Sequence, residues 1–422
     1  VPITWARSYG ELVRETYYIE GVVSSALAPD GGYILIGSKR NDWSINPWLM
    51  RIDSYGNIIW EETVDISYPA NALAGIRIIH MGDDDYTTVC GNGVLWIWRM
   101  DGDGGIRWMK RYTSGGDYYG NGLSLRHTVD GGYVVAGWKQ EGYLTDRDFY
   151  VLKTDESGEI EWQRSYGGPE EDWAYWIIQT HDGRYVVGGY TRSFGLGNDD
   201  AWILRLDIGG DVVWQKSMGG VGDDDVLAIL ETPGGDFVAA GWTSSFDLPH
   251  FDSWIFKLSR DGEVLWQKRY GNSDGDFTNS IIRTDSGHFV AAGQTFWDAW
   301  IFAVDDDGNV LWEKTYGGAE MDDISNDNIL ASDGGFLLTG AVAELLDYPF
   351  NYDFLAVKLD REGNMLSPCS LIVAGEPSSH VFETDAVPMD TTAVPVEADA
   401  VASDETFTVT TTEAEVRTYC GD

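Results

Sequence analysis

The chain has 422 residues and carries 28 Lys and Arg against 69 Asp and Glu, which gives a formal net charge of −41. A field this negative repels phosphate backbones and anionic membrane surfaces, so it argues against nucleic-acid binding. No apolar run approaches the ~20 residues that a membrane-spanning helix needs, and we expect no membrane span. Hydrophobic residues make up 43% of the sequence, which is enough for a sizeable core.

The chain begins with Val1 and Pro2 rather than with Met, which indicates a mature product whose secretion signal has been removed. We therefore expect an extracellular or cell-surface location. Acidic, Lys-poor surfaces also occur in salt-adapted cytoplasmic proteins, so the charge alone does not decide the compartment.

A repeat of about 50 residues runs through most of the chain. Its clearest mark is a Trp followed four residues later by Tyr-Gly, as in segments 162–168 and 312–318. Seven related segments occur, at Trp5, Trp60, Trp108, Trp162, Trp214, Trp266 and Trp312.

Each unit contains four short runs rich in β-branched and aromatic residues. In chain order these are a run such as 174–179, a second run after a Gly-rich turn, an apolar run such as 200–207, and the run that carries the repeated Trp. The third and fourth runs are joined by a turn written Asp-x-x-Gly, as from Asp207 to Gly210. Four antiparallel strands, which we call a to d outward from the axis, are typical of a propeller blade. The sequence therefore predicts an all-β, seven-bladed β-propeller.

The two ends of the repeat region complement one another. The chain opens with a d strand, residues 3–10, and the last unit, about 324–360, has only strands a, b and c. We expect the N-terminal strand to complete the seventh blade, which leaves no unpaired edge at the seam. The predicted propeller domain is 1–366.

At these residues the chain resembles the β-propeller repeats of secreted and surface proteins of archaea and bacteria. It is similar, more distantly, to the repeats of the quinoprotein dehydrogenases. Asp207, Gly210 and Trp214 look like that family's tryptophan-docking motif shortened by one residue. The resemblance covers about 360 residues as architecture. It implies a fold and raises the expectation of a filament-forming surface protein.

Residues 367–422 form a tail of different composition, with 11 acidic residues and one Arg. The stretch 383–417 divides into five heptads that begin at Glu383, Asp390, Glu397, Asp404 and Thr411. Pro388, Pro395 and the Thr and Val content argue against a coiled coil, so we expect an extended, β-prone segment. Its partner is either this propeller or a neighbouring molecule.

Cys369 and Cys420 bracket the tail and are the natural disulfide pair in an exported protein. Cys90 stands where other b strands place Ala or Gly, so it is expected to be a buried small residue.

Catalytic candidates are few, because the six His residues show no metal-ligand spacing and no nucleophile motif is present. We interpret the Asp-rich clusters between strands c and d as structural hairpin turns; calcium-binding loops are the alternative. A possible divalent-cation site is a partial ring of acids before strand a, which are otherwise solvated loop acids: Asp172, Asp225, Asp276 and Asp323. We expect no other cofactor.

Aromatic residues gather in the variable b-to-c loops and suggest a contact surface, although they could instead pack over blade edges. With Phe407 of the tail, the expected interface residues are Trp43, Trp138, Tyr143, Phe194, Phe246, Phe251, Trp297 and Phe350.

These features favour a non-enzymatic, secreted propeller that assembles with copies of itself into a surface filament or layer, its tail contacting a neighbouring subunit. The alternative is a propeller that binds a ligand, such as a surface glycan or another surface protein. A quinone-dependent dehydrogenase is the third hypothesis, disfavoured by the seven blades and the absence of an adjacent Cys pair.

Overall fold

The computed structural model describes most of the propeller and six short pieces of the tail. The described residues are 3–10, 21–41, 44–66, 74–91, 94–113, 118–141, 146–245, 250–271, 275–295, 298–317, 321–344, 352–365, 380–383, 389–390, 396–397, 401–404, 408–411 and 415–420. Every regular element in these ranges is a strand, so none is an apolar helix long enough to cross a membrane.

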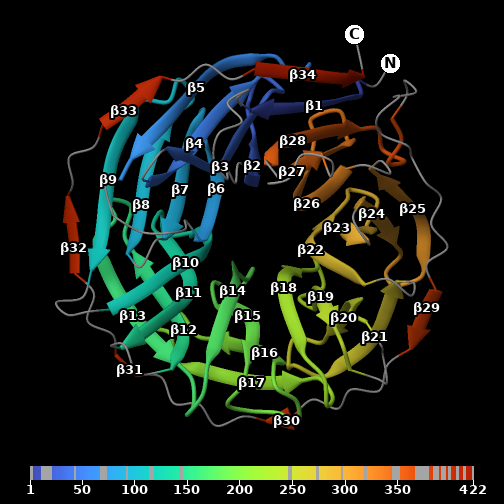
Figure 1. The fold of residues 1–422 in the computed structure, drawn as a ribbon. Coiled ribbons are helices and arrows are strands. Elements are labelled where there is room, and N and C mark those ends of the chain that lie inside the picture. Colours follow the sequence, from blue (N-terminus) through green and yellow to red (C-terminus); the bar gives the residue numbers. More distant parts are fainter. Residues whose placement is uncertain are drawn as a thin grey trace.

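Seven antiparallel sheets stand in a ring, with the a strands β2, β6, β10, β14, β18, β22 and β26 around the centre (Figure 1). The first four blades are β2 (Gly21–Leu27), β3 (Tyr33–Asn41), β4 (Ser44–Ile52), β5 (Ile58–Asp65); β6 (Ala74–Gly82), β7 (Asp85–Gly91), β8 (Leu95–Asp101), β9 (Ile106–Thr113); β10 (Tyr118–His127), β11 (Tyr133–Glu141), β12 (Arg147–Thr154), β13 (Ile160–Tyr166); and β14 (Asp172–Gln179), β15 (Tyr185–Thr191), β16 (Asp200–Leu206), β17 (Val212–Met218). Blades 5 to 7 are β18 (Asp224–Glu231), β19 (Phe237–Thr243), β20 (Asp252–Leu258), β21 (Val264–Gly271); β22 (Asp276–Arg283), β23 (Phe289–Thr295), β24 (Asp298–Val304), β25 (Val310–Tyr316); and β26 (Met321–Leu330), β27 (Phe336–Glu344), β28 (Tyr352–Leu359), β1 (Trp5–Gly10). The predicted seven-bladed propeller is confirmed.

The ring closes as the sequence predicts. β1 is antiparallel to β28, in a register that pairs Trp5 with Lys358 and Tyr9 with Phe354. Because the first strand is the outer strand of the last blade, the two ends of the repeat region are held together by main-chain hydrogen bonds.

The core lies between neighbouring blades, where b and c strands present large apolar side chains to one another. Trp202 of blade 4 packs against Phe149 of blade 3 with ring centroids 4.5 Å apart, and both side chains are fully buried. Cys90 is also fully buried, in the core that includes blades 1 and 2, as expected for its strand position.

The repeated Trp of the outer strands, and the Tyr four residues later in the five strands that have it, dock on the c-to-d turn of the next blade. From blade 3 the Trp162 indole N–H donates to Ile208 O at 3.1 Å, and the Tyr166 hydroxyl donates to Gly210 O at 2.6 Å. The same indole contact recurs at Trp5, Trp60, Trp214 and Trp266. The same hydroxyl contact recurs at Tyr9, Tyr112, Tyr270 and Tyr316.

Six of the seven c-to-d turns open with Asp, and Ser259 opens the other; the Asp serves the turn itself. Asp155 Oδ1 accepts the backbone N–H groups of Ser157 and Glu159, each at 2.9 Å. Asp101 holds Asp103 and Gly105 in the same way. These carboxylates thus act as side-chain caps of hairpin turns, the structural role that the sequence favoured.

The tail pieces form short strands along the outer rim, drawn in red in Figure 1. Each lies antiparallel to the outer strand of one blade and makes six of the seven sheets five-stranded. In chain order they are β29 (His380–Glu383) on β21, β30 (Met389–Asp390) on β17, β31 (Val396–Glu397) on β13, β32 (Val401–Asp404) on β9, β33 (Thr408–Thr411) on β5 and β34 (Glu415–Cys420) on β1.

The tail register explains the heptads. In six of the seven blades, the third residue after the repeated Trp is paired with a described tail residue. Successive tail partners are seven apart: Phe382, Met389, Val396, Ser403, Thr410 and Arg417. Seven extended residues span at most about 25 Å. The heptad is therefore the step from one outer strand to the next, and the tail takes these steps in the direction opposite to the main chain.

The docking of Trp162 on Gly210 can be tested with Gly210→Ala. Gly210 has φ +85°, and a Cβ there would lie 2.9 Å from the Trp162 ring. We expect a loss of stability of about 1 to 2 kcal/mol from the left-handed backbone and about 1 to 3 kcal/mol more from overpacking. Urea unfolding measures the sum.

Gly183→Ala is the matched control, because Gly183 lies in the same blade with φ +79° and no atom within 4 Å of the added Cβ. It should show only the backbone cost. Equal losses in the two variants would contradict the docking role of Gly210.

Candidate functional site

The outer rim carries a basic position that recurs from blade to blade. Two residues after the repeated Trp, six of the seven outer strands have Lys or Arg, in a chain whose net charge is −41. The seven residues are Arg7, Glu62, Lys110, Arg164, Lys216, Lys268 and Lys314. Because alternate strand residues share a face, this position has the same place in every blade.

The tail meets this position with acids. Across four consecutive blades the facing pairs are Lys268 with Glu383, Lys216 with Asp390, Arg164 with Glu397 and Lys110 with Asp404. Where the rim instead has Glu62, the tail has an uncharged residue, Thr411. In antiparallel sheets generally, opposite charges at directly facing positions contribute ~0.2–1 kcal/mol. Hence the first residue of each heptad is acidic where the facing rim residue is basic, and uncharged where the facing rim residue is Glu62.

The same rim lysines and arginines also contact neighbouring blades. Lys110 Nζ lies 2.5 Å from Glu159 Oε1, and Arg164 Nη1 lies 3.4 Å from Asp211 Oδ1. Lys268 Nζ donates to Asn309 Oδ1 at 3.1 Å. These contacts hold the cationic groups in fixed places beside the strand edge, where an extended acidic peptide can pair with both backbone and charge.

Three of the predicted interface aromatics are described, and they pack on neighbouring rings. Trp138 lies within β11, not in a loop, and is 6% exposed against Trp173, with ring centroids 5.1 Å apart. Phe194 packs on Trp202 at 5.4 Å, and Phe251 meets Trp242 edge-on at 4.8 Å. Phe251 keeps 37% of its surface exposed. Trp43, Tyr143, Phe246, Trp297, Phe350 and Phe407 lie outside the described residues.

The three candidate acids whose side chains the structure describes, Asp172, Asp225 and Asp276, are buried and are not solvated loop residues. Asp172 is fully buried, and its carboxylate accepts hydrogen bonds from Gly168 N at 2.9 Å, from Ser193 Oγ at 2.8 Å and from the Thr191 hydroxyl. Asp224 makes the equivalent set of contacts with its own loops, so it is the counterpart of Asp172. These carboxylates clamp the d-to-a loop to the b-to-c loop.

Asp225 is therefore one residue out of phase with the other candidates. Its side chain is 5% exposed, and Oδ1 has no hydrogen-bond partner among the described residues. Burial, followed by the charges of Asp199 and Asp224, raises its pKa well above the usual range. Asp276 is 1% exposed, and the side chain of Asp323 lies outside the described part. No three His, Cys, Asp or Glu side chains converge as metal ligands among the described residues.

The predicted Cys369–Cys420 bond cannot be placed, because Cys369 lies outside the described residues. The backbone of Cys420 ends β34, opposite Ala6 of β1.

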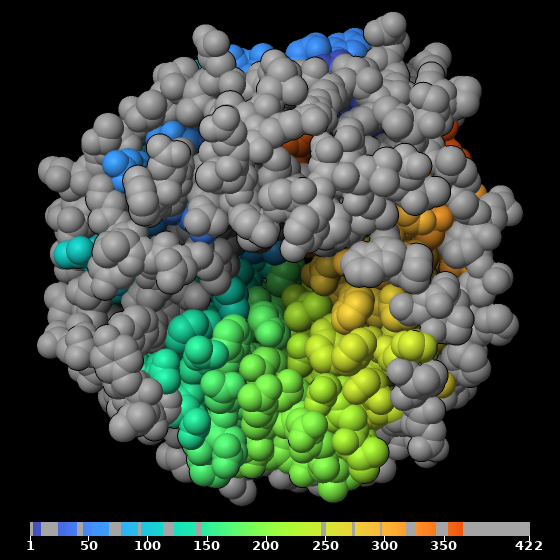
Figure 2. Space-filling view, in the orientation of Figure 1, coloured from blue at the N-terminus to red at the C-terminus, as the bar shows by residue number. Residues whose placement is uncertain are grey.

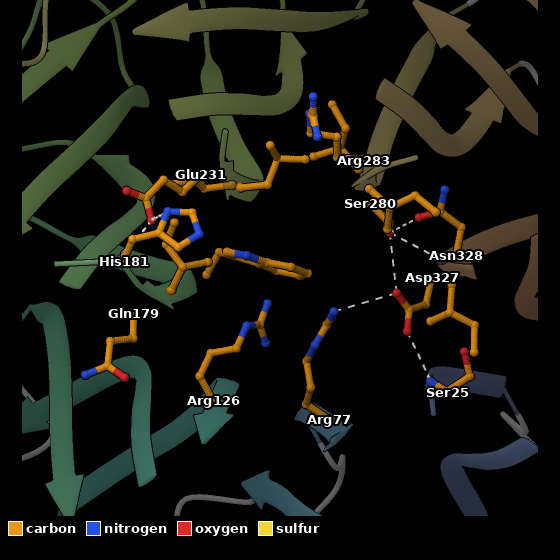
Figure 3. A pocket seen from close by; sticks show the side chains of 17 residues that line it. Ser25, Arg77, Arg126, Gln179, His181, Glu231, Ser280, Arg283, Asp327 and Asn328 are labelled. Atoms are coloured by element: carbon orange, nitrogen blue, oxygen red, sulfur yellow. Dashed lines mark hydrogen bonds and ion pairs between the residues drawn. The ribbon is translucent and has the colours of Figure 1, made fainter. Parts of the chain in front are cut away.

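A cavity of about 410 Å³ lies in the central channel, where the a strands approach the short a-to-b turns. It is thus on the side opposite the b-to-c loops. Figure 2 shows, in the orientation of Figure 1, the surface of blades 3 to 6 around the centre. Figure 3 shows Arg77 and Arg126 projecting into the cavity from β6 and β10, with Asp327 beyond Arg77.

Both arginines of this cavity lie over the ring of Trp176. The guanidinium of Arg77 lies 3.9 Å, and that of Arg126 lies 4.5 Å, from the Trp176 ring centroid. Arg77 Nη2 also lies 3.6 Å from Asp327 Oδ1. Asp327 Oδ2 accepts Ser25 N at 3.1 Å, and Oδ1 accepts Ser280 Oγ at 3.4 Å.

Sequence reasoning missed these channel residues, although the aligned repeats contain the signal. The first residue after the β-bulge of strand a is Ser24, Arg77, Ser124, Trp176, Ala228, Ser280 or Asp327. Two residues later, the seven blades have Ala26, Ile79, Arg126, Ile178, Leu230, Ile282 and Ile329. Arg126 is the one charged residue of its set, and such departures from a repeat mark specialised positions.

No protein-family model matches the chain. The regulatory protein FlaEY of Caulobacter vibrioides is 23% identical over 180 residues, which is 36% of this chain and 18% of FlaEY. The chain thus matches less than a fifth of that relative's length. Among solved structures, Sqt1 from Chaetomium thermophilum has a TM-score of 0.49 at 12% identity, over 86% of this chain and 90% of Sqt1. A putative gluconolactonase has a TM-score of 0.41 at 13% identity, over 68% of this chain and 89% of that protein.

The buried Asp225 predicts a pH-dependent gain from Asp225→Asn. A carboxyl group with a raised folded pKa stabilises the fold below its unfolded pKa of ~4, and this stabilisation is lost as pH rises through the folded value. The variant avoids the loss, so we expect it to be more stable than the parent by about 1 to 3 kcal/mol at pH 8 and equal to it at pH 4. Calorimetry at both pH values measures the difference.

Asp172→Asn is the contrasting variant. Its amide NH₂ would face the hydrogen-bond donors Gly168, Ser193 or Thr191, so we expect lower stability at both pH values. A gain for Asp225→Asn at pH 4 as large as at pH 8 would show that charge is not the cause.

Proposed function

We propose that the protein is a non-enzymatic, extracellular structural subunit that assembles with copies of itself by exchanging its tail. The acidic tail of one copy occupies the basic rim of a neighbour and pairs there in the register that it uses on its own rim. The observation that carries the proposal is the complementary charge of facing rim and tail positions in four consecutive blades, from Lys268 with Glu383 to Lys110 with Asp404.

Exchange has a small energetic cost because the contacts are the same in both arrangements. The tail strands are 2 to 6 residues long, so each is weak alone and the tail binds through several linked contacts. Since every outer strand presents the same position to the tail, a neighbour's rim is an equivalent acceptor. Copies joined head to tail in this way form an open filament or layer when the rotation between them does not close.

The experiment uses two charge-reversed chains. One carries Lys110→Glu, Arg164→Glu, Lys216→Glu and Lys268→Glu, and the other carries Asp404→Lys, Glu397→Lys, Asp390→Lys and Glu383→Lys. Alone, each has a rim and a tail of like charge, so we expect a released tail and a monomer. Mixed, each tail fits the other chain's rim. We expect mixed assemblies by light scattering and negative-stain microscopy.

Two controls complete the test. A chain with both sets of reversals restores the match within one molecule and should assemble as the parent does, whereas a chain lacking 367–422 should remain a folded monomer. Mixed reversed chains that stay monomeric, or a truncated chain that still polymerises, would show that assembly does not use the tail.

A second candidate, a ligand-binding propeller, is favoured by the cavity in the central channel. Its ligands could be surface glycans or other surface proteins if the loop face is used, but the described loop aromatics Trp138 and Phe194 pack on neighbouring rings. The channel is the better place for a small ligand, since its polar groups converge on one cavity.

A further inference from the structure

The channel cavity has an excess of positive charge inside a strongly acidic protein. Its lining includes three arginines, Arg77, Arg126 and Arg283, and two carboxylates, Glu231 and Asp327. At least one positive charge is therefore in excess at a place that the net charge of −41 would not predict.

Both carboxylates already have partners. Glu231 Oε2 lies 3.0 Å from His181 Nδ1 and accepts His181 N at 2.7 Å. Asp327, with a side chain 2% exposed, lies 3.6 Å from Arg77 Nη2 and accepts Ser25 N at 3.1 Å. Neither carboxylate is paired with Arg126, on which Asp327 acts only as a nearby charge that favours the protonated guanidinium.

Arg126 has no carboxylate partner among the described residues. Its Nη1 donates to Leu125 O at 2.7 Å, and its guanidinium lies over the Trp176 ring. Burial, followed by the nearby positive charge of Arg77, lowers the pKa of Arg126 to about 9. A guanidinium has five donor N–H groups, so several remain for a ligand. An anion in the cavity would relieve the repulsion between the two arginines.

The Trp176 indole supplies a second donor that is not used by the protein. Trp176 is 7% exposed and lines the cavity, and its Nε1 has no hydrogen-bond partner among the described residues. A buried N–H without an acceptor costs ~1–3 kcal/mol. An acceptor on a ligand that reaches this N–H would remove that cost.

The rest of the lining determines the kind of anion. Ile178, Ile229, Ile282 and Ile329 give the cavity an apolar wall, and its volume of about 410 Å³ suits a small organic molecule. A planar carboxylate matches the fork of a guanidinium. We propose that the channel binds a small organic monocarboxylate, whose carboxylate group contacts Arg126 and the Trp176 N–H while its apolar body lies against the isoleucines.

The test is isothermal titration of the full chain with benzoate and hexanoate, and with the neutral isosteres benzamide and hexanamide. We expect at least one carboxylate to bind and its amide to bind at least tenfold more weakly. Arg126→Gln should raise the dissociation constant at least tenfold. Trp176→Phe keeps a ring in place but removes the N–H, and should weaken binding about three- to tenfold.

Arg107→Gln is the matched control, since it removes one positive charge from a side chain on the outer strand β9 that is 52% exposed. It should leave the affinity unchanged. If Arg126→Gln does not fold, the amide comparison and Trp176→Phe decide. The proposal is overturned if neither carboxylate binds, if the amides bind equally well, or if inorganic phosphate binds as tightly as either carboxylate.

Discussion

The contact on which the ring depends is the docking of one blade's Trp and Tyr on the next blade's turn. In a ring of sheets, each sheet buries its faces only against the neighbouring sheets. A contact that fixes the spacing and tilt of the seven sheets is therefore needed. The hydrogen bonds from Trp162 and Tyr166 to the turn that ends at Gly210 supply it at the outer edge. A glycine is required because its φ is +85° and the indole occupies the space of a Cβ.

The same periodic contact creates the surface that the tail uses. Since each docked Trp fixes the position of its strand, the residues two and three places later repeat around the rim with the same orientation. The tail pairs with that pattern in steps of seven residues, and its acids at Glu383, Asp390, Glu397 and Asp404 face basic rim residues. Individually weak pairs become a specific contact because the spacing must agree over several blades.

The channel departs from this regularity. At the innermost strands most positions carry small or apolar residues, whereas Arg77, Trp176 and Asp327 take equivalent positions in three different blades. Where they meet Arg126 and Arg283, the channel holds a positively charged cavity inside an acidic molecule. A closed ring allows this, because substitutions in blades far apart in the sequence meet at one axis without disturbing the outer docking contacts.

The sequence by itself determined the seven blades, the closing strand and the structural role of the turn acids, because each depends on short-range patterns that repeat. It also contained the heptads, but their spacing could be explained only from the distance between neighbouring outer strands. Glu383 and Lys268 are 115 positions apart in the sequence and become neighbours only when the ring is formed. The alignment of the repeats was wrong by one residue at Asp225, because its neighbour Asp224 is the carboxylate that links the d-to-a loop to the b-to-c loop. Only the tertiary structure brought Arg77, Arg126 and Trp176 together, since ring closure, and no local pattern, sets distances across the channel.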